Sequence, residues 1–258
     1  MELNVSNLHF SYGTRPILDG VNFTIRSGDR VALLGPNGTG KTTLFRCLMQ
    51  FLRYSGSVTV DGATLKTMSP KEFSRHIAYI PQSEAPTFNY PVRDVVLMGV
   101  TGQLGAFSAP KTEHREKVLL TLEHLGIAHL ADRGYATLSG GERQLVMLSR
   151  AMVQEAKLLI MDEPTANLDF ANRCRVMDAV VQMSKEGYAI LYSTHHPGQS
   201  GLYASRVLAL LEGKVFIDGT ADDLTETALS KLYGMDVALR SVNFEGKTIT
   251  VCLPGGGA

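Results

Sequence analysis

A glycine-rich segment near the N-terminus limits the folds open to this chain more than any other feature. It reads Gly35-Pro36-Asn37-Gly38-Thr39-Gly40-Lys41-Thr42 and matches the pattern G-x-x-x-x-G-K-[ST] in full. The apolar stretch Arg30–Leu34 before it predicts a strand, and Lys41–Leu52 after it predicts a helix. A strand, such a loop and a helix in this order are typical of a parallel α/β sheet.

The residue types of this segment suit a phosphate group. Glycines let backbone N–H groups approach phosphate oxygens without a clashing Cβ, and the helix N-terminus adds partial positive charge. Lys41 can reach the β- and γ-phosphates, and the Thr42 hydroxyl can ligate Mg²⁺. The alternative is a chance glycine turn, which the flanking strand and helix disfavour. We predict a site for a nucleoside triphosphate with Mg²⁺ formed by Gly35, Asn37, Gly38, Gly40, Lys41, Thr42 and Thr43.

Two acidic residues follow a second apolar stretch. Leu158–Met161 predicts a buried strand, and it leads into Asp162-Glu163-Pro164. Asp162 is a candidate Mg²⁺ ligand, and Glu163 is a candidate to polarise an attacking water near the γ-phosphate. A solvated turn before proline is the alternative, and the phosphate loop upstream makes it the weaker one.

The arrangement of expected elements predicts one α/β domain over residues 1–258. Strands and helices alternate in residues 1–82 and again in 157–220, which we assign to a core with a parallel sheet and antiparallel strands at its edge. Residues from about 83 to 156 carry helical apolar stripes and are predicted to be a helical subdomain. Residues from about 221 to 258 form a short extension, in which Asp236–Val242 and Lys247–Leu253 are expected to pair around Glu245-Gly246.

Composition excludes several other classes. The formal net charge is zero, which argues against nucleic acid as a partner. The three cysteines are far apart and favour small core groups over a disulfide framework or a zinc site. No signal peptide is visible, and no run approaches the roughly 20 apolar residues of a membrane-spanning helix. If the protein serves a membrane, other chains are expected to span it.

A third motif lies about 100 residues after the phosphate loop and reads Leu138-Ser139-Gly140-Gly141-Glu142. Ser139 is a good N-cap, and the two glycines would leave helix N–H groups open to an anion. A plain helix cap is the alternative for this motif in isolation.

With this motif the chain resembles the ATP-binding cassette (ABC) family. The resemblance covers about residues 1–220, with each family motif in the expected order. It implies a P-loop NTPase core with a RecA-like sheet, an antiparallel β edge subdomain and a helical subdomain. It also implies that Ser139, Gly140 and Gly141 contact the γ-phosphate of ATP held by a second copy of the chain. Two copies then enclose two ATP molecules as a head-to-tail homodimer, which opens after hydrolysis.

Four further positions match the family pattern one at a time. Tyr12 matches the aromatic residue that stacks on adenine, and Gln82 matches the glutamine that touches Mg²⁺ and the attacking water. Asp169, in Ala166-Asn167-Leu168-Asp169, matches a dimer-contact residue, and His195 matches the histidine that senses the γ-phosphate. Ordinary structural roles are the alternatives, as a strand-edge tyrosine, a polar loop glutamine and a strand-end histidine.

Two positions depart from the pattern. His196 stands where the family usually has aspartate, so the hydrogen bonds that orient this loop are expected to differ. Leu145 stands where a basic residue is usual. We expect a change in rate and not a loss of activity, because Ser139 and Gly141 are present.

Other segments resemble the type II importer branch for iron siderophores, haem and cobalamin. These are Phe88–Gly99 and Leu232–Val237, while Thr194–Pro197 is similar to molybdate-type members. The resemblance implies an ATPase subunit on the cytoplasmic face of the membrane, with a separate permease and, indirectly, a solute-binding protein. An iron chelate is the first cargo expected; cobalamin, haem, molybdate and an exporter role are the alternatives. We expect Gln82–Val95 to form part of the groove that receives the permease.

Overall fold

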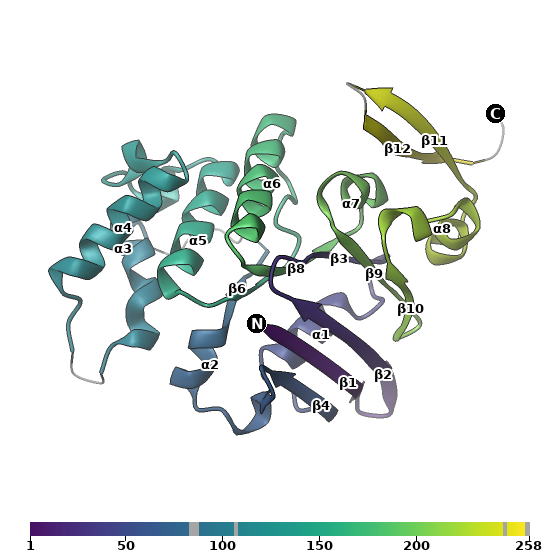
Figure 1. Cartoon of the computed structure of the whole chain (residues 1–258), viewed down its shortest axis with the longest axis horizontal. Coiled ribbons are helices and arrows are strands. Elements are labelled where there is room, and N and C mark those ends of the chain that lie inside the picture. The colour runs from purple at the N-terminus through teal and green to yellow at the C-terminus, as the bar shows by residue number, and fades with distance from the viewer. Residues whose placement is uncertain (83–87, 106–107, 245–246, 256–258) are drawn as a thin grey trace.

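Six strands form the central sheet of the computed structural model, which describes residues 1–82, 88–105, 108–244 and 247–255 (Figure 1). Their order is β10 (Lys214–Gly219), β9 (Arg206–Leu211), β3 (Arg30–Leu34), β8 (Ala189–Thr194), β7 (Leu158–Met161) and β6 (Ile77–Ile80). All neighbours are parallel except the edge pair β10 and β9. Strands β7 and β8 are buried throughout, which explains their uninterrupted apolar runs.

The register of this sheet brings the predicted motifs to one edge. Leu34 lies opposite Thr194, and Met161 lies opposite both Ile80 and Tyr192. Parallel strands therefore end together where the phosphate loop, the acidic pair and the segments of Gln82 and His195 begin. Ligands of open α/β sheets bind at this carboxyl edge.

A second, antiparallel sheet has the order β2 (Arg15–Arg26), β1 (Glu2–Tyr12), β4 (Ser55–Val60) and β5 (Ala63–Thr64). Helix α1 (Lys41–Leu48) lies between the two sheets, since Leu44, Phe45 and Leu48 pack in one core with residues of both. The helix after the phosphate loop is thus held on two sides.

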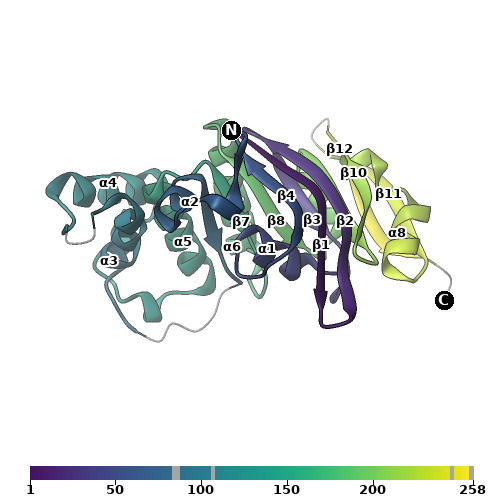
Figure 2. The same ribbon diagram turned by 90° about the horizontal axis from the view of Figure 1, so that it is seen from below.

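Helices gather on the other face of the central sheet and beyond β6. They are α3 (Val92–Leu97), α4 (Thr112–His124), α5 (Gly140–Gln154) and α6 (Phe170–Lys185), with 3₁₀ helices η2 (Met98–Gln103), η3 (Ala128–Leu130) and η4 (Tyr135–Thr137). Their apolar residues form one core with Ala32, Ala78 and Ile80 of the sheet. Figures 1 and 2 both place α3 and α4 at one end of the molecule.

The C-terminal part lies at the opposite end in both views (Figure 2). It consists of η5 (Ala221–Asp223), α8 (Glu226–Tyr233) and a hairpin of β11 (Val237–Phe244) and β12 (Lys247–Pro254). The two strands pair as expected, and the predicted turn at 245–246 lies outside the described residues. Leu224, Leu229 and Leu232 pack against Leu34, the residue that precedes the phosphate loop.

Some elements differ from the sequence-based expectation. Helix α1 ends at Leu48 and not at Leu52, because Gln50 adopts a left-handed φ of 59°. Helices α2 (Pro70–His76), α7 (Pro197–Tyr203) and α8 were not predicted, and neither were η1 (Leu65–Thr67) and η5. Helix α2 buries no side chain and so has no apolar stripe; its signal is the capping box of Ser69 and Glu72.

Two predictions from composition concern the cysteines and membrane-spanning helices. Cys47 is a buried core residue, and the partly buried Cys252 packs against the core around Leu229, whereas Cys174 is partly buried and belongs to none of the described cores. Among the described residues, no helix has both the length and the apolar character needed to cross a bilayer.

Candidate functional site

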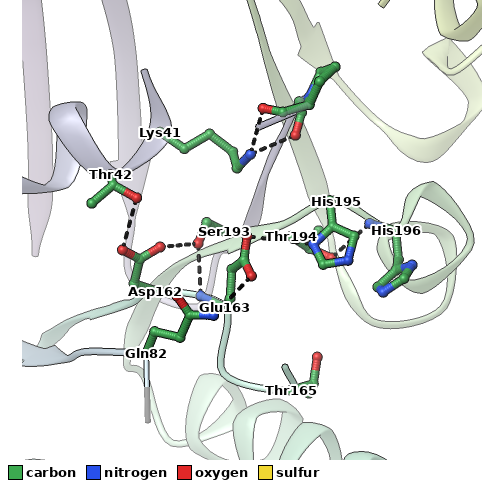
Figure 3. A network of polar contacts seen from close by, with 12 residues as sticks. Lys41, Thr42, Gln82, Asp162, Glu163, Thr165, Ser193, Thr194, His195 and His196 are labelled. Carbon is green, nitrogen blue, oxygen red and sulfur yellow. Dashed lines mark hydrogen bonds and ion pairs between the residues drawn. The ribbon is translucent and has the colours of Figure 1, made fainter. Parts of the chain in front are cut away.

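The phosphate loop folds around the side chain of Lys41. Its Nζ donates hydrogen bonds to the carbonyl oxygens of Gly35 at 2.6 Å and Pro36 at 2.9 Å (Figure 3). Gly38 and Gly40 have φ of 84° and 103°, which side chains rarely adopt. A Cβ on Gly40 would also lie 3.1 Å from Leu18. The glycines therefore permit a turn that points this lysine into the loop.

Lys41 is a buried cation in need of an anion. It is 6% exposed, and burial lowers the pKa of its ammonium group, while the Glu163 and Asp162 carboxylates oppose that shift. Neither carboxylate lies within ion-pair distance of Nζ, and no other carboxylate of the described residues does. A phosphate group at the loop would supply the missing negative charge.

Asp162 connects the phosphate loop to strand β8. Oδ2 accepts a hydrogen bond from the Thr42 hydroxyl at 3.1 Å, and Oδ1 accepts one from the Ser193 hydroxyl at 2.6 Å. The Ser193 oxygen in turn accepts from the backbone N–H of Glu163 at 2.8 Å. One buried serine thus fixes both acidic residues.

Glu163 contacts two other predicted site residues, His195 and Gln82. Nδ1 of His195 lies 3.5 Å from its Oε1, and Nε2 of Gln82 donates to its Oε2 at 3.4 Å. Glu163 has a left-handed φ of 46°, and nearby Asn167 has one of 58°. Such backbone strain is common at functional sites. The three side chains line a cavity of about 260 Å³.

The loop after β8 is held by buried polar groups. The Thr194 hydroxyl accepts from the backbone N–H of His196 at 3.1 Å and donates to the Gln199 side chain at 3.2 Å. The same glutamine is hydrogen-bonded to the Thr165 hydroxyl, close to the acidic pair. The His196 ring packs against His195, with centroids 4.0 Å apart. Burial, together with the His195 and Arg173 charges, lowers the pKa of His196, so its neutral form is favoured.

Tyr12 lies at the end of β1, with its ring exposed. The side chain is 47% exposed and meets Phe10 edge-on, at a centroid distance of 4.8 Å. The ring is therefore accessible from solvent, as the predicted contact with adenine requires.

The third motif begins α5 and packs on the start of α6. Ser139 is its N-cap and forms a reciprocal capping box with Glu142. A Cβ on Gly141 would come within 2.4 Å of the Asn172 side chain, and one on Gly140 within 2.9 Å of Leu168. Packing therefore requires a glycine at position 141, whereas at position 140 the contact is with the end of the flexible Leu168 side chain, which can move.

Asp169 is the N-cap of α6. It accepts from the backbone N–H of Asn172 at 2.8 Å and from its side-chain amide at 2.7 Å. Those backbone and side-chain bonds lower the pKa of the carboxyl group, with burial opposing. Within the described residues, the hydrogen bonds of Ser139 and Asp169 stay local, and none reaches the phosphate loop.

The structure therefore divides the predicted residues into two groups. Lys41, Thr42, Asp162, Glu163, Gln82 and His195 meet at the carboxyl edge of the sheet, whereas Ser139, Gly140, Gly141 and Asp169 form a separate cluster. Sequence reasoning missed the linking roles of Ser193, Thr194 and Gln199. Two hydroxyl residues at the end of an apolar strand were the available signal.

The parallel sheet and the phosphate loop define a P-loop nucleotide-binding protein. The acidic pair at the carboxyl edge of the sheet is typical of an ATPase. Residues 18–166 match the family described as ABC transporter. The chain belongs to the ABC transporter family; it is an ATP-binding domain with ATPase activity, and the prediction from the motifs is confirmed.

Three similar proteins extend over nearly the whole chain. An uncharacterized ABC transporter ATP-binding protein of Haemophilus influenzae is 39% identical, with 90% of this chain and 89% of that protein covered. A probable iron chelatin transport ATP-binding protein of Helicobacter pylori is 35% identical over 98% of this chain and 100% of its own length. A solved inward-facing structure of an ABC transporter assigned to the metal-chelate type has a TM-score of 0.87 and 31% identity, covering 98% and 97% of the two chains.

Proposed function

We propose that this chain is the ATP-hydrolysing subunit of an importer that takes up an iron chelate through a separate permease. The observation that carries the ATPase part is the joining of Glu163 to Gln82 and His195, beside Lys41 and Asp162. In this proposal Lys41 grips the triphosphate and Tyr12 stacks on adenine. The phosphate cradle is completed by the backbone N–H groups of Gly38 and Gly40 and by the side chain of Asn37. Thr43, in the first turn of α1, belongs to the same proposed site.

The residues at Asp162 fit Mg²⁺. Thr42 and Asp162 place a hydroxyl and a carboxylate oxygen 3.1 Å apart, and Gln82, which follows the neighbouring strand β6, carries an amide oxygen as a further donor. Oxygen donors of this kind are those that Mg²⁺ prefers. When bound with ATP, the ion would neutralise charge on the phosphates.

Glu163 acts on water in this proposal. Its carboxylate orients the attacking water and accepts its proton, while His195 and Gln82 restrain the two carboxylate oxygens. Ser193 keeps Glu163 in its strained backbone conformation by accepting its N–H. Neutral His196 adds no charge beside His195.

The separate cluster at α5 supports a second copy of the chain as partner. Ser139, Gly140 and Gly141 present helix N–H groups at a start that packs on α6, away from the chain's own phosphate loop. A head-to-tail homodimer would bring them to the ATP of the other copy, with Asp169 bracing the opposite site. We also propose the division into a core (1–82 and 157–220), a helical subdomain (about 83–156) and an extension (about 221–258).

The permease is proposed to contact the segment Gln82–Val95, of which 83–87 lie outside the described residues. Phe88 and Tyr90 are exposed at the start of the helical part, with ring centroids 5.9 Å apart. Exposed aromatic residues are frequent at protein interfaces. The subunit would then sit on the cytoplasmic face of the membrane, and a solute-binding protein would act on the other side.

An iron chelate is the favoured cargo because a relative 35% identical over its full length is named for iron chelatin transport. The metal-chelate assignment of the similar solved structure points the same way. Haem, cobalamin or molybdate are the alternatives, along with an exporter role.

Uptake by cells tests this proposal. A strain without the gene should lose uptake of a ⁵⁵Fe-labelled siderophore, and the wild-type gene should restore it while a Glu163→Gln copy should not. Labelled haem, cobalamin and molybdate are measured in parallel. Loss of one of those alone would change the cargo, and faster accumulation of a compound in the deletion strain would indicate export.

A further inference from the structure

A tyrosine from the C-terminal extension reaches the loop of His195. The hydroxyl of Tyr233, the last residue of α8, donates a hydrogen bond to the backbone carbonyl of His195 at 3.1 Å. The two residues are 38 positions apart in sequence. The contact therefore depends on how the extension packs, and not on any local motif.

The Tyr233 side chain is suited to be a permanent donor. It is half-buried, and burial, with Cys252 nearby, raises the pKa of its phenol. The hydroxyl therefore keeps its proton at neutral pH. A carbonyl oxygen is an acceptor only, so the direction of this hydrogen bond is unambiguous.

Helix α8 is itself held firmly. It ends at Gly234, which has a left-handed φ of 67°, and the Ser230 hydroxyl accepts from the backbone N–H of Val237 at 2.9 Å. The Glu226 carboxylate accepts from the N–H of Leu239 at 2.7 Å. Helix α8 and the hairpin are therefore joined by two hydrogen bonds.

The hairpin also packs on α7, which begins two residues after His195. Pro197 and Gly201 of α7 face Leu229, Leu239 and Cys252 across a very small cavity. Figure 1 shows α7 beside the hairpin and α8. The extension thus touches both the carbonyl of His195 and the helix that follows it.

We infer that Tyr233 is a positioning residue for ATP hydrolysis: by holding the His195 carbonyl, it sets where the His195 ring lies relative to Glu163. The inference rests on the proposed role of His195. The 3.5 Å approach of the ring to Glu163 depends on the peptide plane that Tyr233 restrains. Small displacements of reacting groups lower turnover steeply.

The hydrogen bond can be observed directly. The chain has seven histidines, and only His195 and His196 are adjacent. Labelling with [¹³C,¹⁵N]-histidine therefore yields one carbonyl-to-amide correlation in an HNCO spectrum, that of His195 to His196. Tyr233→Phe should shift this single peak, whereas Tyr54→Phe, which removes a buried hydroxyl without a hydrogen-bond partner, should leave it in place.

Kinetics supply the second readout. Tyr233→Phe should lower kcat for ATP by about threefold to tenfold, the effect of one hydrogen bond, with KM and the Kd for ATP unchanged. Tyr54→Phe should match the wild type in all three. A purely structural tyrosine would shift the NMR peak and leave kcat alone.

Three outcomes would overturn the inference: an unmoved peak, a moved peak with wild-type kcat, or a change in KM with kcat intact. The proposed function is tested separately by His195→Ala and Glu163→Gln in the same assay. Normal hydrolysis by those two variants would refute the site itself, whatever Tyr233→Phe does.

Discussion

At the scale of single residues, Glu163 is held by three contacts on the wall of a cavity. Its backbone N–H is bound by Ser193, and its two carboxylate oxygens are met by His195 and Gln82. Its left-handed φ is a cost that these contacts offset. A residue held so firmly in a strained conformation, beside a buried lysine, is better suited to orient a reactant than to stabilise the fold.

Glu163→Gln keeps the size of the side chain and removes its charge. We expect hydrolysis to fall by about 10²- to 10⁴-fold because a general base is lost, with the Kd for ATP within about twofold of wild type. Release of ³²P-phosphate measures the rate of hydrolysis, and equilibrium binding measures the Kd for ATP. Glu116→Gln, an exposed carboxylate on α4, is the matched control and should hydrolyse normally. Near-normal turnover by Glu163→Gln would refute the assignment.

At the scale of elements, the predicted site residues lie at the ends of strands and at the starts of helices. Strands β3, β7 and β8 end at one edge and deliver Lys41, Asp162 and His195. The starts of α5 and α6 instead pack on each other, with Gly141 against Asn172 and Asn172 hydrogen-bonded to Asp169. A displacement of the start of α5 is therefore expected to displace the start of α6 as well.

Gly141→Ala tests this coupling between helices. Its Cβ would lie 2.4 Å from the Asn172 side chain and force α5 and α6 apart. We expect ATPase activity to fall at least about tenfold, with ATP binding unchanged because the phosphate loop is elsewhere.

Removing the clash should restore activity to the Gly141→Ala variant. Asn172→Gly in the same chain takes away the atoms in contact, although glycine in a helix costs about 1 kcal/mol of stability. Gly198→Ala, where a Cβ meets nothing within 4 Å, is the control and should be active. If the double variant is no better than Gly141→Ala, steric conflict is not the cause.

At the scale of the whole molecule, the predicted site residues form two separate clusters, and we propose that each cluster is half of an ATP site. Lys41 and Ser139 belong to different clusters, and their hydrogen bonds within the described residues do not connect them. A homodimer of opposed copies would join each half to the other's complement. The C-terminal extension lies at the far end from α3 and α4, so it can act on His195 without blocking the proposed permease contact (Figure 1).

Mixing two inactive variants tests the shared site. Lys41→Ala should lose ATP binding and Ser139→Arg should lose closure, so each homodimer is inactive. A mixed dimer has one intact site, and random pairing should return about a quarter of wild-type activity. The measurement is ATPase rate against mixing ratio, with each variant mixed with itself as control. Zero activity at every ratio would argue that Lys41 and Ser139 serve the same copy's site.

Local sequence determined much of this protein. The phosphate loop and its flanking strand and helix, the buried runs of β3 and β7, and the acidic pair follow from short-range rules, because glycine freedom and apolar periodicity act over a few residues. Helices α7 and α8 were not predicted, since each is short and has too few buried residues to give a helical pattern of apolar residues.

Tertiary structure alone decided what connects these pieces. Ser193 joins Asp162 to Glu163, Gln199 joins Thr165 to Thr194, and Tyr233 reaches His195. Such contacts link residues far apart in the chain, and nothing in the residue types alone marks a serine or tyrosine as the partner of a distant group. Short-range preferences choose the elements, whereas the packing of sheet edges and helices against one another chooses which polar groups meet.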